Sequence, residues 1–114
     1  MIKVKWDIEE AVAIVDVYFK YQRDEIKDLG KSLERLSQTL IKRADILNIK
    51  HDDKFRNLNG MKSILANVEY IDSDGSVGLS NASKIIRTAV ELYKNDRDQF
   101  DNFLIRFQEK YEKH

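Results

Sequence analysis

Apolar side chains recur at intervals of three and four residues along most of this chain, which is the spacing of amphipathic helices. Asp7 followed by Glu10 has the spacing of a capping box, so the first helix should start near Asp7. From Ala11 to Tyr18 this helix is apolar nearly all round, as expected for an element that packs on several sides. It is predicted to be the central helix of the core.

A second, long helix is predicted from a leucine-rich face that consists of Ile26, Leu29, Leu33, Leu36, Leu40, Ala44 and Leu47. Gly30 lies within this pattern, so it marks either a kink or a later start of the helix at Ser32. A short third helix should begin near Asn57 or Asn59, because both are good N-cap residues. Its buried positions are expected to be Met61, Ile64, Leu65 and Val68.

Two further helices complete the pattern. Residues 71–79 have the composition of a loop, after which Ser80 or Asn81 can cap a fourth helix. A fifth helix follows Asn95-Asp96, and its one-sided apolar face is assigned to packing: Phe100, Phe103, Leu104, Phe107 and Tyr111. All 114 residues are therefore expected to form a single all-α domain of about five helices. A trihelical, helix-turn-helix-like core is one arrangement of such helices.

The residues before the first helix alternate between apolar and basic side chains. Ile2, Val4 and Trp6 fall on one side, and Lys3 and Lys5 fall on the other. A period of two is that of an extended backbone. We expect a short arm that packs its apolar side on the helices.

Composition agrees with a folded helical domain and narrows its chemistry. Hydrophobic residues make up 42% and charged residues 35% of the chain, which is typical of a folded and highly charged protein. Twenty basic and twenty acidic residues balance, so any nucleic-acid binding requires a local basic patch. The absence of cysteine excludes disulfides, and no apolar run approaches the roughly 18 residues of a membrane helix. We expect a soluble, cytoplasmic protein without a membrane contact.

No catalytic motif is recognisable, so neither enzymatic activity nor a cofactor is expected. The chain has no P-loop, dinucleotide-binding glycine motif, nucleophile elbow or His-Glu-x-x-His sequence. The run His51-Asp52-Asp53 contains metal-ligand types, but adjacent residues rarely converge on one ion, and a solvated loop is favoured. Asp72-Ser73-Asp74-Gly75 resembles part of a calcium loop without its closing Glu, which favours a turn stabilised by Asp side chains.

The start of the predicted third helix is the strongest candidate for a binding site. Two cations and two amides gather there, where free backbone N–H groups already favour a phosphate. Arg and Asn side chains also read base edges, Arg toward guanine and Asn toward adenine. The candidate nucleic-acid-binding residues are Arg56, Asn57, Asn59 and Lys62, with Arg43 and Lys54 nearby for phosphate.

A structural interpretation of the same residues is also open. Polar residues at helix starts are common, so Asn57 and Asn59 could serve only as caps. Arg56 would then pair with Asp52 or Asp53. Exposure of the two asparagines on a basic surface around Arg56 favours nucleic acid, whereas their burial favours a protein partner.

Several short motifs occur in a recognisable order: Trp6 with Glu9-Glu10-Ala11, Tyr18-Phe19, Leu36-Ser37, Leu40 with Arg43-Ala44, Phe55-Arg56-Asn57-Leu58-Asn59-Gly60-Met61 with Leu65 and Asn67, and Gly78-Leu79-Ser80-Asn81-Ala82-Ser83. This order resembles a small helical domain found N-terminal to HNH-type restriction endonucleases and other bacterial defence proteins. The Phe-Arg-Asn-x-Asn-Gly core is its most specific part. The family has a Met-Lys-Leu triplet soon after the glycine, whereas Met61-Lys62 is followed here by Ser63-Ile64-Leu65.

The resemblance implies a recognition or targeting module of a restriction or defence system, without the cutting activity. Its expected partners are duplex DNA and a nuclease or helicase. The alternative is a protein-interaction domain, or a homodimer, that uses an apolar helical face.

Overall fold

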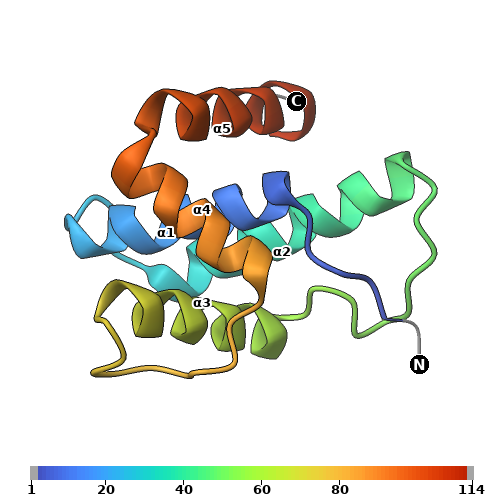
Figure 1. The fold of residues 1–114 in the computed structure, drawn as a ribbon. Coiled ribbons are helices and arrows are strands. Elements are labelled where there is room, and N and C mark those ends of the chain that lie inside the picture. Colours follow the sequence, from blue (N-terminus) through green and yellow to red (C-terminus); the bar gives the residue numbers. More distant parts are fainter. Residues whose placement is uncertain (1–2, 113–114) are drawn as a thin grey trace.

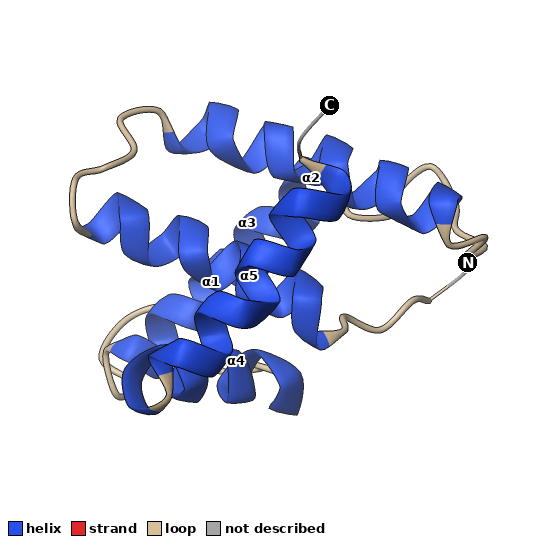
Figure 2. Ribbon diagram, turned by 90° about the horizontal axis from the view of Figure 1, so that it is seen from above, coloured by secondary structure: helices blue, strands red, loops and turns tan. Residues whose placement is uncertain are grey.

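The computed structural model describes residues 3–112, and within them the fold is all-α (Figures 1 and 2). Its five helices are α1 (Ile8–Gln22), α2 (Leu29–Ile46), α3 (Leu58–Asp72), α4 (Lys84–Asn95) and α5 (Arg97–Tyr111). They pack around one hydrophobic core, which confirms the predicted single all-α domain of about five helices. No helix in this part of the chain is long and apolar enough to cross a membrane.

Helix α1 is the centre of the fold, as its pattern predicts. It packs against each of the other four helices, and Figure 1 shows α5 above it and α3 below. The run Ala11–Val15 is at most 3% exposed, because apolar residues on every side of the helix meet a neighbour. Asp7 caps the helix, and the full capping box with Glu10 is present. The expected start and the central role of this helix are therefore confirmed.

Helix α2 begins earlier than Ser32. Asp28 is the N-cap, and its side chain accepts a hydrogen bond from the backbone N–H of Lys31 at 3.0 Å. Gly30 lies exposed in the first turn and the helix runs through it. The sequence predicted either a kink at Gly30 or a helix start at Ser32. The helix instead starts at Leu29, directly after the Asp28 cap.

Helix α3 is as long as α1, with 15 residues each, so the expectation of a short helix is wrong. Its last turn is held at Asp72, which accepts a hydrogen bond from the Tyr18 hydroxyl at 2.9 Å and pairs with Lys94 at 2.9 Å. Tyr18 belongs to α1 and Lys94 to α4, so contacts with other helices extend α3 into residues 71–72, which the composition predicted to be loop. The first expected N-cap, Asn57, is confirmed.

Helix α4 begins at Lys84, and its N-cap is Ser83, not Ser80 or Asn81. The residues before it form a loop that is fastened to α3. Leu79 donates its backbone N–H to the carbonyl of Ala66 at 3.1 Å, and the Asn67 amide donates to the carbonyl of Leu79 at 2.9 Å. Because this loop is bonded to α3 up to Leu79, the helix begins two or three residues later than the composition predicts.

The aromatic face of α5 packs into the core, as predicted. Phe100, Phe107 and Tyr111 are buried, and Phe103 and Leu104 are half-buried against the same core. The helix begins directly after Asp96, as expected, and Asp96 is its N-cap.

The first three helices do not form a helix-turn-helix unit. Residues 47–57 separate α2 from α3, which is much longer than the 3–4-residue turn of that motif. The amino-terminal arm agrees with its pattern where it is described: Val4 and Trp6 are half-buried, whereas Lys3 and Lys5 are exposed. Ile2 lies outside the described residues.

Candidate nucleic-acid interface

Arg56 is buried, although the sequence made it the leading DNA contact. Its side chain is 7% exposed, and it forms a two-pronged pair with Glu10 of α1, at 2.6 Å from Nε and 2.9 Å from a terminal nitrogen. The remaining guanidinium bonds go to the carbonyls of Val4 and Lys5, each at 3.2 Å. Four of the five N–H donors of the guanidinium are thus used within the protein, which leaves it no fork for a phosphate or a guanine.

The rings of Trp6 and Phe55 enclose the same guanidinium. Its central carbon lies 4.5 Å from the centre of the Trp6 ring and 4.3 Å from that of Phe55. The backbone of Arg56 has a left-handed φ of 49°, and its carbonyl accepts a hydrogen bond from the Ser37 hydroxyl at 2.6 Å. Arg56 therefore joins the arm, α1, α2 and the start of α3. Both expectations for it, DNA contact and pairing with Asp52 or Asp53, are corrected.

Arg43 is also a structural residue. It is 7% exposed and pairs with Asp7 at 2.8 Å and Glu9 at 3.1 Å, and it lies over the ring of Tyr111. Its Nε atom is buried and makes no hydrogen bond within the described part of the chain. Because Arg43 is buried next to two carboxylates, it is not available as a phosphate contact, and that expectation is corrected. The sequence could not show this, because the carboxylates belong to the start of α1 and Arg43 belongs to α2.

Asn57 is an exposed N-cap, which agrees with the structural interpretation of this residue. Its side-chain oxygen accepts from the backbone N–H of Gly60 at 2.9 Å. A methyl group at Gly60 would lie 3.1 Å from that oxygen, so the glycine lets the cap approach closely. Each part of the Phe-Arg-Asn-x-Asn-Gly sequence except Asn59 thus has a structural task.

The other candidates lie on two sides of α3. Lys54 and Asn57 line a hollow of about 350 Å³ together with Val4, Trp6 and the edge of Arg56. Lys62 lines a different hollow that includes Glu69. Asn59 is exposed and lines neither of them. The exposed candidate residues therefore do not form one surface. Lys54 and Asn57 lie beside the arm, whereas Asn59 and Lys62 lie elsewhere on α3.

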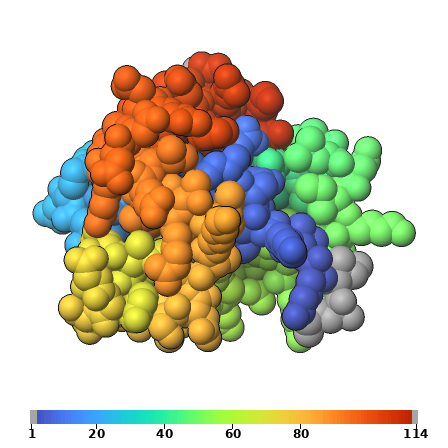
Figure 3. Space-filling view, viewed as in Figure 1, coloured from blue at the N-terminus to red at the C-terminus, as the bar shows by residue number. Residues whose placement is uncertain are grey.

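A second hollow of about 460 Å³ continues from the first and shares Trp6 and Ile64 with it. Its remaining lining comes from the arm, from the middle of α3 and from the start of α4: Lys5, Asn67, Asn81, Ser83, Lys84 and Ile85. In Figure 3 the arm, in blue, and the segment that enters α4, in orange, lie side by side on one face. We call the two hollows together the Trp6 groove.

Sequence inspection missed the lysines of the arm and of α4. Lys5, Lys54 and Lys84 are exposed around the groove, and none of them forms an ion pair with a carboxylate among residues 3–112. Asp52 is the one carboxylate that lines the groove in this part of the chain. A signal was present in the sequence, because residues 54–68 and 75–90 contain cations and no acid. Only the fold shows that these stretches meet at Trp6.

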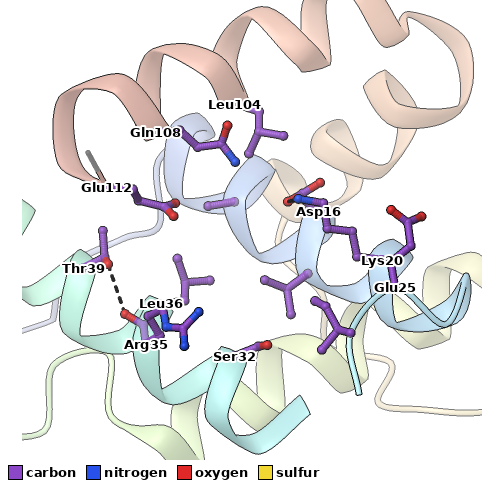
Figure 4. A pocket seen from close by; sticks show the side chains of 13 residues that line it. Asp16, Lys20, Glu25, Ser32, Arg35, Leu36, Thr39, Leu104, Gln108 and Glu112 are labelled. Atoms are coloured by element: carbon purple, nitrogen blue, oxygen red, sulfur yellow. Dashed lines mark hydrogen bonds and ion pairs between the residues drawn. The ribbon is translucent and has the colours of Figure 1, made fainter. Parts of the chain in front are cut away.

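A further hollow, of about 420 Å³, lies between α1, α2 and α5 (Figure 4). Charges of both signs line it: Asp16, Lys20, Glu25, Arg35 and Glu112. Burial raises the pKa of Asp16, against the opposing effect of its ion pair with Lys20 at 3.0 Å. Desolvation and the nearby Asp16 raise the pKa of Glu112. Three carboxylates make this cleft a poor match for a phosphate.

Asp16→Asn should stabilise the protein near neutral pH and lose that advantage in acid. A raised native pKa means that the charged carboxylate costs stability above that pKa, and that the cost disappears as the pH falls toward the ordinary value of 3.8. The gain at pH 7 should not exceed about 1 kcal/mol, since the variant also loses the Lys20 pair. Urea unfolding at pH 7 and pH 4 measures it.

The matched control for that variant is Glu34→Gln, because Glu34 is an exposed carboxylate on α2. This control should change stability little at either pH. If Asp16→Asn lowers stability equally at both pH values, its effect does not come from the charge of Asp16, and the expectation is wrong.

Metal-ligand types do not converge in the described structure. Among residues 3–112 no group of three or more His, Asp or Glu side chains is placed to hold a metal ion. His51 instead bonds to Asp45 at 2.7 Å and stacks on Phe55.

Comparisons with protein-family models, curated protein sequences and solved structures found no match to this chain.

Proposed function

We propose that this domain binds nucleic acid through the Trp6 groove, with DNA as the first ligand to test. The observation that carries the proposal is the meeting of Lys5, Lys54 and Lys84 around one aromatic ring, from three segments far apart in the sequence. Unpaired lysines on a concave surface attract phosphates, and an aromatic ring among them offers a face for a base.

The local arrangement of charge matters here because the total charge is zero. A neutral protein lacks the overall positive field that drives non-specific binding, so its affinity depends on the few lysines that a strand can reach at once. Lys3, also on the arm, is exposed but lines neither hollow. The contribution of Arg56 is indirect, since it fixes Trp6 and the start of α3 in place.

The residues expected from the sequence keep part of their role in this proposal. Lys54 and Asn57 line the groove, and the exposed Asn59 and Lys62 are available to a longer DNA segment on the outer side of α3. Arg43 and Arg56 are excluded from direct contact by their ion pairs. The proposed link to restriction or defence systems, and to a nuclease or helicase partner, rests on the motif resemblance alone.

A protein-interaction function has less support from the surface. The exposed large apolar residues lie at Tyr21, at Ile46 and Leu47, at Val77 and Leu79, and at Ile105. They belong to four separate places, namely the end of α1, the end of α2, the loop that precedes α4, and helix α5 itself. Figure 1 shows these four places on different sides of the molecule. Single exposed apolar residues are normal on a monomer, whereas an interface needs a continuous patch.

The triple variant Lys5→Ala/Lys54→Ala/Lys84→Ala should lose most of its affinity for DNA. Three phosphate contacts give a slope of log affinity against log salt of roughly −2.7 on duplex DNA, and removing all three should bring the slope near zero. At 50 mM salt we expect the affinity to fall at least tenfold, as measured by fluorescence anisotropy with a labelled oligonucleotide.

The matched control removes the same charge from another part of the surface. Lys27→Ala/Lys42→Ala/Arg106→Ala replaces three exposed cations that line no part of the groove. It should keep the wild-type salt slope. Absence of DNA binding by the wild-type protein at low salt, or equal losses in the two triple variants, would contradict the proposal.

A further inference from the structure

The hollow between the arm, α3 and α4 combines groups that suit one nucleotide. Trp6, Ile64 and Ile85 supply apolar walls, Asn67 and Asn81 supply amides, and Lys5 and Lys84 supply positive charge. Its volume of about 460 Å³ falls within the range of roughly 300–1,000 Å³ that is usual for small-molecule sites. Such a site is large enough for a base with its sugar and phosphate.

Trp6 is held in place before any ligand arrives. Arg56 lies against its ring at 4.5 Å, and Arg56 is itself fixed by Glu10 and Phe55. Trp6 lines both hollows, whereas Arg56 lines only the first, so a ligand in the second hollow reaches Trp6 without meeting the guanidinium. A fixed aromatic ring binds a base without the entropy cost of ordering its own side chain.

Asn67 adds a hydrogen-bonding group with a fixed orientation. It is 7% exposed, and its nitrogen donates to the carbonyl of Leu79 at 2.9 Å. The opposite orientation would place two acceptor oxygens together, so the amide oxygen must be the other atom. That oxygen accepts no hydrogen bond from the described residues, and Asn67 lines the hollow. It is therefore ready to accept an N–H from a base edge.

The start of α4 borders the same hollow and has no side-chain cap. Asp7, Asp28, Asn57 and Asp96 each bond the first turn of their own helix, whereas Ser83 does not. The first backbone N–H groups of α4 therefore lie beside Lys84 without a side-chain acceptor. Lys5 lines the same hollow, so two cations and these N–H groups give it positive charge beside Trp6.

We propose that this hollow binds one unpaired nucleotide of a nucleic-acid strand. The base packs on Trp6 and bonds with its edge to Asn67 and Asn81, and the phosphate lies near Lys5, Lys84 and the start of α4. A base inside a duplex is stacked on both sides and cannot enter, so the site selects a looped-out or single-stranded nucleotide. This inference rests on the proposed nucleic-acid binding and names the part of the ligand that the groove recognises.

The only tryptophan of the chain reports directly on this site. Trp6 emission is followed while the protein is titrated with four probes: a paired 12-mer DNA, the same duplex with one extra unpaired nucleotide, a single-stranded 12-mer and a mononucleotide. We expect the duplex with the extra nucleotide and the single-stranded 12-mer to bind about tenfold tighter than the paired duplex and to quench the emission. The mononucleotide should bind far more weakly than the strand, because it lacks the neighbouring phosphates.

Two variants test the site by anisotropy. Trp6→Leu should reduce affinity for the unpaired probes to that for the paired duplex, and Trp6→Phe should restore most of the preference because it keeps a ring. If Trp6→Leu fails to fold after uncovering Arg56, Asn81→Ala is the second variant, since Asn81 is exposed and bonds to no described side chain. It should weaken the preference severalfold. Gln38→Ala, on the exposed side of α2, is the control.

The outcomes separate the two proposals. Equal affinity for paired and unpaired probes, with unchanged Trp6 emission, would overturn the nucleotide site and leave nucleic-acid binding in place. A mononucleotide that binds as tightly as the strand would overturn the assignment to a strand. Failure of every DNA probe to bind at 20 mM salt would overturn the proposed function itself.

Discussion

Replacing Arg56 by alanine should destabilise the protein by about 3–5 kcal/mol, the usual cost of breaking a buried ion pair from one side. The reason is that Glu10 is only 2% exposed and would keep its charge after losing the cation that it pairs with. The carbonyls of Val4 and Lys5 would lose their donor as well, and Trp6 and Phe55 would lose the group between them. Thermal and urea unfolding measure the loss, and a fall in Tm of roughly 10 °C or more is expected.

The double variant Glu10→Met/Arg56→Met provides the control for this prediction. Removing both charges together leaves no uncompensated buried charge, so the double variant should be clearly more stable than Arg56→Ala. If Arg56→Ala costs less than about 1 kcal/mol but abolishes DNA binding, Arg56 acts as a direct contact and the structural assignment is wrong.

Gly78→Ala should have the second large effect, with a loss of at least about 2–3 kcal/mol from a strained backbone and a steric clash. Gly78 has φ +95°, and an added Cβ would overlap the carbonyl oxygen of Ala66 and lie 2.7 Å from the backbone nitrogen of Tyr70. Both are backbone atoms of α3, so no side-chain rotation relieves the contact. The loop before α4 should move away from α3 and break the bond from Asn67 to Leu79.

Gly30→Ala is the matched control, because Gly30 lies in the first turn of α2 with helical geometry. Its added Cβ would meet only the Asp28 side chain, at an ordinary 3.5 Å. Alanine there should raise stability by about 0.5–1 kcal/mol through helix propensity and a restricted unfolded state. Urea unfolding of both variants tests the contrast, and equal effects of the two substitutions would refute the role given to Gly78.

The helices were largely predictable because each depends on signals within a few residues. Asp7 and Asn57 cap their helices where the sequence places caps, and α5 begins directly after Asp96 as expected. Most of the periodic apolar positions are buried or half-buried, and Leu47 at the end of α2 is an exposed exception. The errors lie where a contact from elsewhere in the chain decides. Helix α3 extends to Asp72 because Tyr18 and Lys94 bind the Asp72 side chain. Helix α4 starts later than predicted because the loop before it is hydrogen-bonded to α3 at Leu79.

The candidate site was less predictable, because the same side chain serves different purposes depending on its surroundings. An arginine beside asparagines at a helix start can bind a phosphate or a carboxylate of the protein, and the sequence does not distinguish them. The partner of Arg56 is Glu10, 46 positions away, and not the nearby Asp52 or Asp53. Likewise, the free lysines of the groove come from segments whose proximity no local pattern reveals.

The sequence by itself determined the helical class, the central position of α1 and the packing role of the aromatic residues of α5, because periodicity and caps act over one or two turns. Tertiary structure decided which charges are used up inside the protein and which are free. Burial forces Arg43 and Arg56 into ion pairs, since an unpaired buried charge is too costly. The exposed Lys5, Lys54 and Lys84 bear no such constraint, and the fold brings them together around Trp6.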